Sequence, residues 1–133
     1  MAIICGWKEA QARLWLNSRC APEVRTLIVG VTDDLEIRGI DDELQLLFDN
    51  NPDALKRDFV SKVHALLGHA AEGHMEQNIH QVRGKFLYVV QCTKSSVPIY
   101  LMKGNTENFY IRQDPRTVKL EGSDLVNYIR ANF

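Results

Sequence analysis

Apolar side chains recur at helical spacing in four parts of the chain. The longest part lies between Pro52 and Gly68. Its apolar residues fall on one stripe: Leu55, Phe59, Val63, Leu66 and Leu67. The pattern predicts a helix that begins at Pro52 and ends at Gly68. Shorter helices are predicted over residues 7–16, 41–48 and 123–131.

Residues that favour helix N-caps stand at the start of two of the shorter helices. Asp41 and Asp42 precede the apolar residues of one helix, and Ser123 precedes those of the last. These three residues are therefore the predicted N-caps. The apolar residues of the last helix, Val126 among them, are predicted to face inward.

Residue patterns typical of strands predict three hairpins. An almost continuous apolar run over 24–31 is followed by the turn Thr32-Asp33-Asp34 and a short return strand over 36–40. Residues 77–93 predict a second hairpin that turns at 83–85, and residues 98–112 predict a third that turns at 104–107. We expect one α+β domain over 1–133, with a mixed, mainly antiparallel sheet built from hairpins and three to four packed helices.

Composition fits a globular domain and excludes several classes of protein. Of the 133 residues, 45% are apolar and 25% are charged, which is the ordinary balance for a folded domain. No apolar run is long enough to span a bilayer, and the N-terminus lacks the basic region of a secretory signal. The three cysteines show no CxxC spacing, so reduced thiols and a cytoplasmic location are expected.

Charge is divided unevenly along the chain although the net charge is only −1. Residues 1–79 carry eight Lys/Arg and thirteen Asp/Glu, whereas residues 80–133 carry eight and four. The C-terminal part is therefore basic. Such a division permits a positive face on a nearly neutral protein, and solvated charge without a partner is the alternative.

Three stretches in order resemble the Schlafen/AlbA-like family, which is described as DNA-binding and has RNA-cleaving members. Residues 27–42 are similar to its apolar strand, Gly-Val, acidic turn and Gly-Ile-Asp return. Residues 86–100 resemble its core strand and serine-proline step, and 109–112 its tyrosine-containing strand that ends in arginine. The resemblance covers 24–133 as a family-like core. It implies DNA or RNA as the partner.

The first 23 residues depart from the family pattern. They are predicted to form a divergent N-terminal helix and loop, without the glutamate-containing strand and glycine pair of family members. The nuclease branch is thought to use two glutamates from that segment with an aspartate matched here by Asp33. Asp33 and Asp34 are the only metal candidates, with Mg²⁺ or Mn²⁺ expected only in a nuclease, and both also fit an ordinary turn. Hydrolysis is expected to be absent or barely detectable.

Four histidines follow the predicted long helix or lie in it: His64, His69, His74 and His80. Their spacings of five and six residues do not place two of them on one helical face. We therefore predict no zinc site and no other cofactor.

The predicted nucleic-acid contacts are basic and aromatic residues of the C-terminal part, with Arg112 as the first choice. They are Arg83, Lys85, Lys94, Lys103, Tyr110, Arg112, Arg116 and Lys119. A nucleic-acid-binding module without catalytic activity is the leading interpretation. A metal-dependent endoribonuclease that uses Asp33 and a protein-interaction or assembly domain are the alternatives. Because the family's first strand is missing, the 24–31 strand is expected at a sheet edge, where it could form a homodimer.

Overall fold

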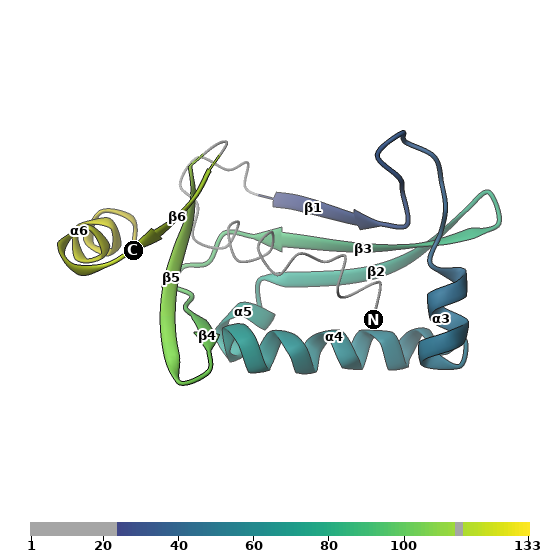
Figure 1. Cartoon of the computed structure of the whole chain (residues 1–133), viewed down its shortest axis with the longest axis horizontal. Coiled ribbons are helices and arrows are strands. Elements are labelled where there is room, and N and C mark those ends of the chain that lie inside the picture. The colour runs from purple at the N-terminus through teal and green to yellow at the C-terminus, as the bar shows by residue number, and fades with distance from the viewer. Residues whose placement is uncertain (1–23, 114–115) are drawn as a thin grey trace.

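The computed structural model describes residues 24–113 and 116–133 (Figure 1). In these residues four helices accompany two three-stranded antiparallel sheets, so the predicted α+β class is confirmed. The helix expected over 7–16 lies outside the described residues. None of the described helices combines the length and apolar composition that a bilayer span requires.

The first sheet has the order β1-β3-β2, with β1 at Val24–Val29, β2 at Met75–Val82 and β3 at Lys85–Thr93. β3 is the central strand, and Leu87, Tyr88, Val90 and Cys92 are buried along it. The β2–β3 hairpin turns at Arg83 and Gly84, whose φ angles of 51° and 75° match the primed turns that suit hairpin twist. This confirms the predicted second hairpin.

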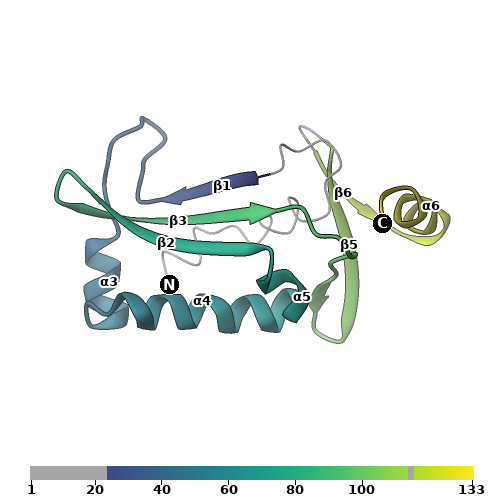
Figure 2. The same ribbon diagram turned by 180° about the vertical axis from the view of Figure 1, so that it is seen from behind.

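Helix α4, Pro52–Leu67, lies along one face of this sheet (Figures 1 and 2). It begins and ends as predicted. The Asn51 side chain accepts hydrogen bonds from the Asp53 and Ala54 amides at 3.0 and 3.2 Å, and Gly68 follows its last turn. The predicted stripe is buried except for Leu66, which is partly buried.

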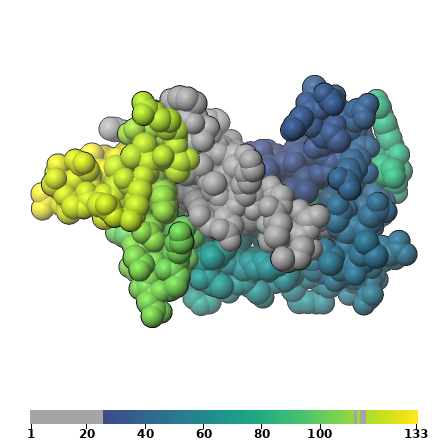
Figure 3. Space-filling view, viewed as in Figure 1, coloured from purple at the N-terminus to yellow at the C-terminus, as the bar shows by residue number. Residues whose placement is uncertain are grey.

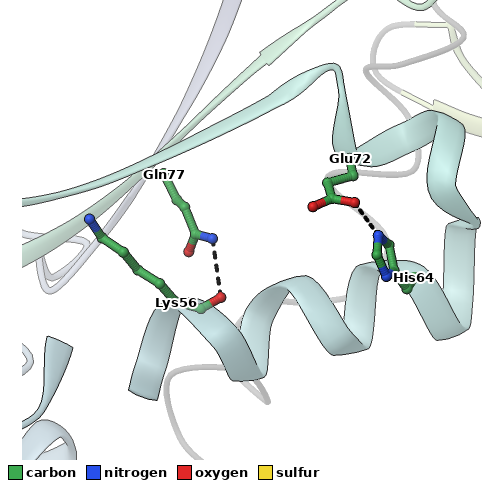
Figure 4. A network of polar contacts seen from close by, with 4 residues as sticks. All are labelled: Lys56, His64, Glu72 and Gln77. Carbon is green, nitrogen blue, oxygen red and sulfur yellow. Dashed lines mark hydrogen bonds and ion pairs between the residues drawn. The ribbon is translucent and has the colours of Figure 1, made fainter. Parts of the chain in front are cut away.

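Two kinds of contact join α4 to the sheet. The rings of Phe59 and Tyr88 meet edge to face with centroids 5.8 Å apart. The Gln77 side chain donates to the Lys56 carbonyl oxygen at 3.1 Å (Figure 4) and accepts a hydrogen bond from the Tyr88 hydroxyl. The helix is therefore anchored by both apolar packing and a polar link from β2. Two short helices flank α4: α3, Asp41–Phe48, and α5, His69–Glu72.

The second sheet stands across one end of the first (Figures 1 and 2). Its order is β4-β5-β6, with β4 at Leu101–Lys103, β5 at Thr106–Gln113 and β6 at Arg116–Leu120. The predicted third hairpin corresponds to β4 and β5, while β6 had no predicted counterpart. The C-terminal helix α6, Gly122–Asn132, projects beyond this sheet. The ring contact between Phe109 of β5 and Tyr128 of α6, at 6.0 Å, joins helix and sheet, and the Tyr100 ring lies 5.4 Å from the same Phe109 ring.

The predicted return strand over 36–40 was wrong. Only one isolated bridge, Val31 to Ile37, forms there, and β1 pairs with β3 instead. The amides of Arg38 and Gly39 both donate to the Gly30 carbonyl oxygen, at 2.9 and 2.8 Å. Gly39 has a φ of 79°, so the backbone turns away from extended geometry at this point.

The predicted N-caps were also wrong. Ile40 and Glu121 occupy the N-cap positions of α3 and α6, and neither uses a side-chain cap. The Asp41 carboxylate instead accepts a hydrogen bond from the Phe86 amide at 3.1 Å, which ties the start of α3 to β3. In α6, Val126 is exposed rather than turned inward, because the helix packs on the sheet through only part of its apolar face.

Candidate nucleic-acid interface

The basic residues Lys103, Arg116 and Lys119 are all exposed on the second sheet. Lys103 ends β4 and pairs with Thr106 at the start of β5, whereas Arg116 begins β6 and pairs with Gln113 at the end of β5. The two pairing partners are separated by most of β5, which is about 24 Å at roughly 3.4 Å per residue. Lys103 and Arg116 therefore lie at opposite ends of β5, one on each of the two strands that flank it.

Lys119 differs from the other two because it has a local acidic partner. Its ammonium group lies 2.5 Å from a Glu121 carboxylate oxygen. This hydrogen bond raises the pKa of Lys119, so the ammonium stays charged, but Glu121 offsets much of that charge. Lys103 and Arg116 are consequently the better candidates for contacts with an anion.

Lys94 is exposed just after β3, and its ammonium group lies 5.9 Å from the centre of the Phe133 ring. A cation over an aromatic face is weakly attracted to the ring. This contact connects the end of the first sheet to the end of α6. Lys94 therefore lies near the second sheet, on the same end of the molecule.

Arg112 and Tyr110 occupy alternate positions of β5. The Arg112 backbone pairs with Thr117, next to the pair that joins Tyr110 to Lys119, and its side chain is outside the described part of the structure. Tyr110 is partly buried against the main core. Its ring therefore offers less surface for base stacking than the sequence pattern suggested.

Arg83 and Lys85 are not brought together with the other basic residues. They lie at the β2–β3 turn, at the end of the first sheet that is remote from β4–β6 (Figures 1 and 3). There they line a shallow pocket with Glu36, next to the acidic turn of residues 33 and 34. The predicted set of contacts is therefore divided between two ends of the molecule.

Asp33 and Asp34 are exposed in the turn after β1. The turn is fixed by Thr32, whose hydroxyl accepts from the Glu36 amide at 3.1 Å. A cavity of about 220 Å³ lies beside it, between Gly30, Gly39 and their neighbours. Within residues 24–113 and 116–133, neither aspartate belongs to a group of three side chains that could share a metal ion.

One group that could share a metal ion was missed by the sequence reasoning. His64, His69 and Glu72 each offer one ligand atom, and these atoms lie within 4.8 Å of one another. The spacing argument assumed that the histidines share a helix, but Gly68 ends α4 and the chain turns into α5. The His-x-x-Glu spacing directly after a helix-ending glycine was the available signal.

No family model, curated protein or solved structure matches the chain.

Proposed function

We propose that the chain is a nucleic-acid-binding module of the Schlafen/AlbA-like type that contacts phosphates through the second sheet. The observation that carries the proposal is the exposure of Lys103 and Arg116 at the two ends of β5. Residues 94–120 contain five Lys/Arg and only two Asp/Glu. A surplus of positive charge around the second sheet is suited to a polyanion, because each neutralised phosphate releases counterions.

The aromatic residues of this region favour phosphate contacts over base stacking. Phe109 is 1% exposed, and the ring of Tyr100 packs against it. Tyr110 packs against the core. Because stacking on unpaired bases requires an accessible ring face, binding is proposed to depend on salt and only weakly on base sequence.

Removal of two charges from the second sheet tests the proposal. In the variant Lys103→Ala/Arg116→Ala, two lost phosphate contacts should flatten the slope of log affinity against log salt by about 1.8 for duplex DNA. The affinity at roughly 0.1 M salt should fall on the order of 50-fold. Fluorescence anisotropy with labelled single-stranded and duplex DNA and RNA, measured over a series of salt concentrations, gives both quantities.

A charge-matched control is available on α4. The variant Lys56→Ala/Arg57→Ala removes two positive charges far from the second sheet and should leave the slope nearly unchanged. Lys85→Ala tests the β2–β3 turn separately. Equal slopes for wild type and Lys103→Ala/Arg116→Ala would refute the proposed surface. Absence of binding at low salt would favour the interaction-domain alternative, and Mn²⁺-dependent cleavage lost in Asp33→Ala would favour the nuclease alternative.

The position of β1 supports self-association as a second candidate function. β1 pairs with β3 on one side, and no described strand pairs with its other side. Ile28 is 51% exposed on this strand. An open edge strand with an apolar residue is a template for pairing with a second copy of the chain.

Light scattering over a wide range of protein concentration should detect this dimer. Ile28→Lys should shift the protein to monomer, because a lysine on an edge strand opposes pairing. Leu46→Lys is the control, since Leu46 is also apolar and is more exposed than Ile28 but lies on α3. A monomer at every concentration, or an Ile28→Lys protein that dimerises like wild type, would contradict the edge-pairing model.

A further inference from the structure

The corner between α4 and α5 is held rigidly by the core. Leu67, the last residue of α4, and Ala71, in the middle of α5, are both buried. Gly68 joins them with a φ of 77°, a conformation that glycine adopts without strain. The single turn of α5 therefore has a fixed position beside the last turns of α4.

This corner gathers two imidazoles and a carboxylate. His69 and Glu72 are three residues apart on α5, so they share one face of its single turn. His64 comes from α4, and its ring centroid lies 4.2 Å from that of His69. The His64 Nε2 atom contacts a Glu72 carboxylate oxygen (Figure 4). Three side chains from two elements thus converge on one point.

The contact between His64 and Glu72 does not explain why the His69 side chain lies beside them. One donor atom from each of the three residues lies within 4.8 Å of the others. Tetrahedral Zn²⁺, with ligand bonds of about 2.0–2.2 Å, holds its donor atoms roughly 3.3–3.5 Å apart. The side chains of His64 and Glu72 are 31% and 44% exposed. Small side-chain rotations at the surface can therefore bring the donor atoms to these separations without movement of the backbone.

We propose that His64, His69 and Glu72 bind a divalent transition-metal ion, with Zn²⁺ as the preferred ion. Imidazole nitrogen suits Zn²⁺, Cu²⁺ and Ni²⁺, whereas Mg²⁺ and Ca²⁺ prefer ligand sets made of oxygen. Three protein ligands leave the fourth tetrahedral position for water, which the exposure of the site allows. The ion would cross-link α4 to α5. This proposal is independent of nucleic-acid binding by the second sheet.

Calorimetric titration of the full chain with Zn²⁺, in the absence of nucleic acid, tests the site. Loss of an outer-shell partner commonly weakens metal binding about 10- to 100-fold, so loss of a ligand should cost at least about tenfold. His69→Ala and Glu72→Gln should each show that loss, and both alter exposed side chains, so the fold should persist. His80→Ala removes an exposed histidine of β2 and should bind Zn²⁺ as wild type does.

A Co²⁺ titration separates this site from sulfur ligation elsewhere in the chain. Ligation by nitrogen and oxygen should give d–d absorption bands without the intense near-ultraviolet band of a thiolate ligand, and His69→Ala should remove those bands. The proposal is overturned if wild type binds no Zn²⁺, if His69→Ala and Glu72→Gln bind it as tightly as wild type, or if the Co²⁺ complex shows thiolate ligation. None of these results depends on the outcome of the nucleic-acid experiments.

Discussion

Replacement of Gly39 by alanine should lower the free energy of unfolding by about 2–5 kcal/mol. Gly39 has a φ of 79°, where a side chain costs roughly 1–2 kcal/mol. The new Cβ would also collide with the Asp41 carboxylate and lie 3.0 Å from the Lys85 Cβ. Because the carboxylate accepts the Phe86 amide, its displacement would weaken a link between α3 and β3, at a cost of roughly 1–3 kcal/mol.

Gly84→Ala provides the matched control for urea unfolding. Gly84 has nearly the same φ, 75°, but a Cβ added there would meet no heavy atom within 4 Å. Replacement of Gly84 by alanine should therefore lower the free energy of unfolding only through the positive φ, by about 1–2 kcal/mol. The difference between the two variants isolates the collision at Gly39. Equal destabilisation by both variants would show that the packing around Gly39 does not matter.

The elements that were predicted best are those specified by several residues close together in the sequence. Helix α4 has a stripe of apolar residues over four turns, a capping asparagine before Pro52 and a glycine after its end. The β2–β3 and β4–β5 hairpins are short-range pairs whose turns contain Gly84 and Gly104. In each case, residues close in sequence determine the element.

The errors arose where distant residues decide the structure. The 36–40 segment contains Ile37 and Ile40 and follows a turn, yet β1 pairs with β3, whose residues are 59 to 69 positions away in sequence. Strand β6 was missed because only Val118 and Leu120 mark its inward face, while its other residues are exposed. Short patterns cannot show which strand a segment will join.

The candidate sites show the same limitation. Linear charge counts located a basic C-terminal part, but they could not show that Arg83 and Lys85 lie at the opposite end of the molecule from Lys103 and Arg116. The spacing argument did not reveal that the rings of His64 and His69 lie close together, because it applied helical spacing across Gly68, where α4 ends. A site built across a chain turn depends on the angle between two elements, which spacing alone does not give.

Stability should fall steeply at alkaline pH because a buried thiol in β3 resists ionisation. Burial raises the pKa of the Cys92 thiol from its ordinary value of 9.0 to about 12. Below pH 9 the thiol is protonated in both the folded and unfolded chain, so its contribution to stability is fully present. Between pH 9 and 12 only the unfolded chain releases the proton, which lowers stability by about 1.4 kcal/mol per pH unit, or on the order of 4 kcal/mol in total.

Urea unfolding of wild type and Cys92→Ala at several values between pH 8 and 10.5 measures this effect. The variant should be less stable at pH 8, because it leaves a small cavity, but its stability should decline less steeply above pH 9. All other titrating groups are shared, so the difference between the two slopes reports on Cys92 alone. Parallel slopes would mean that the thiol ionises equally easily in the folded chain, contrary to its burial.

The variant Tyr88→Phe separates the effect of the Tyr88 hydroxyl on alkaline stability from that of the Cys92 thiol. Burial, with a smaller contribution from the negative charge of Asp58, raises the pKa of the Tyr88 hydroxyl above its ordinary value of 10.0. Wild type should therefore lose stability through Cys92 from pH 9 and through both groups above pH 10. Tyr88→Phe should retain the loss of stability that begins at pH 9 but should lack the additional loss above pH 10. Its stability should be lower than that of wild type at every pH, because the hydrogen bond to Gln77 is removed. If the additional loss of stability above pH 10 persists in Tyr88→Phe, that loss comes from titrating groups other than Tyr88.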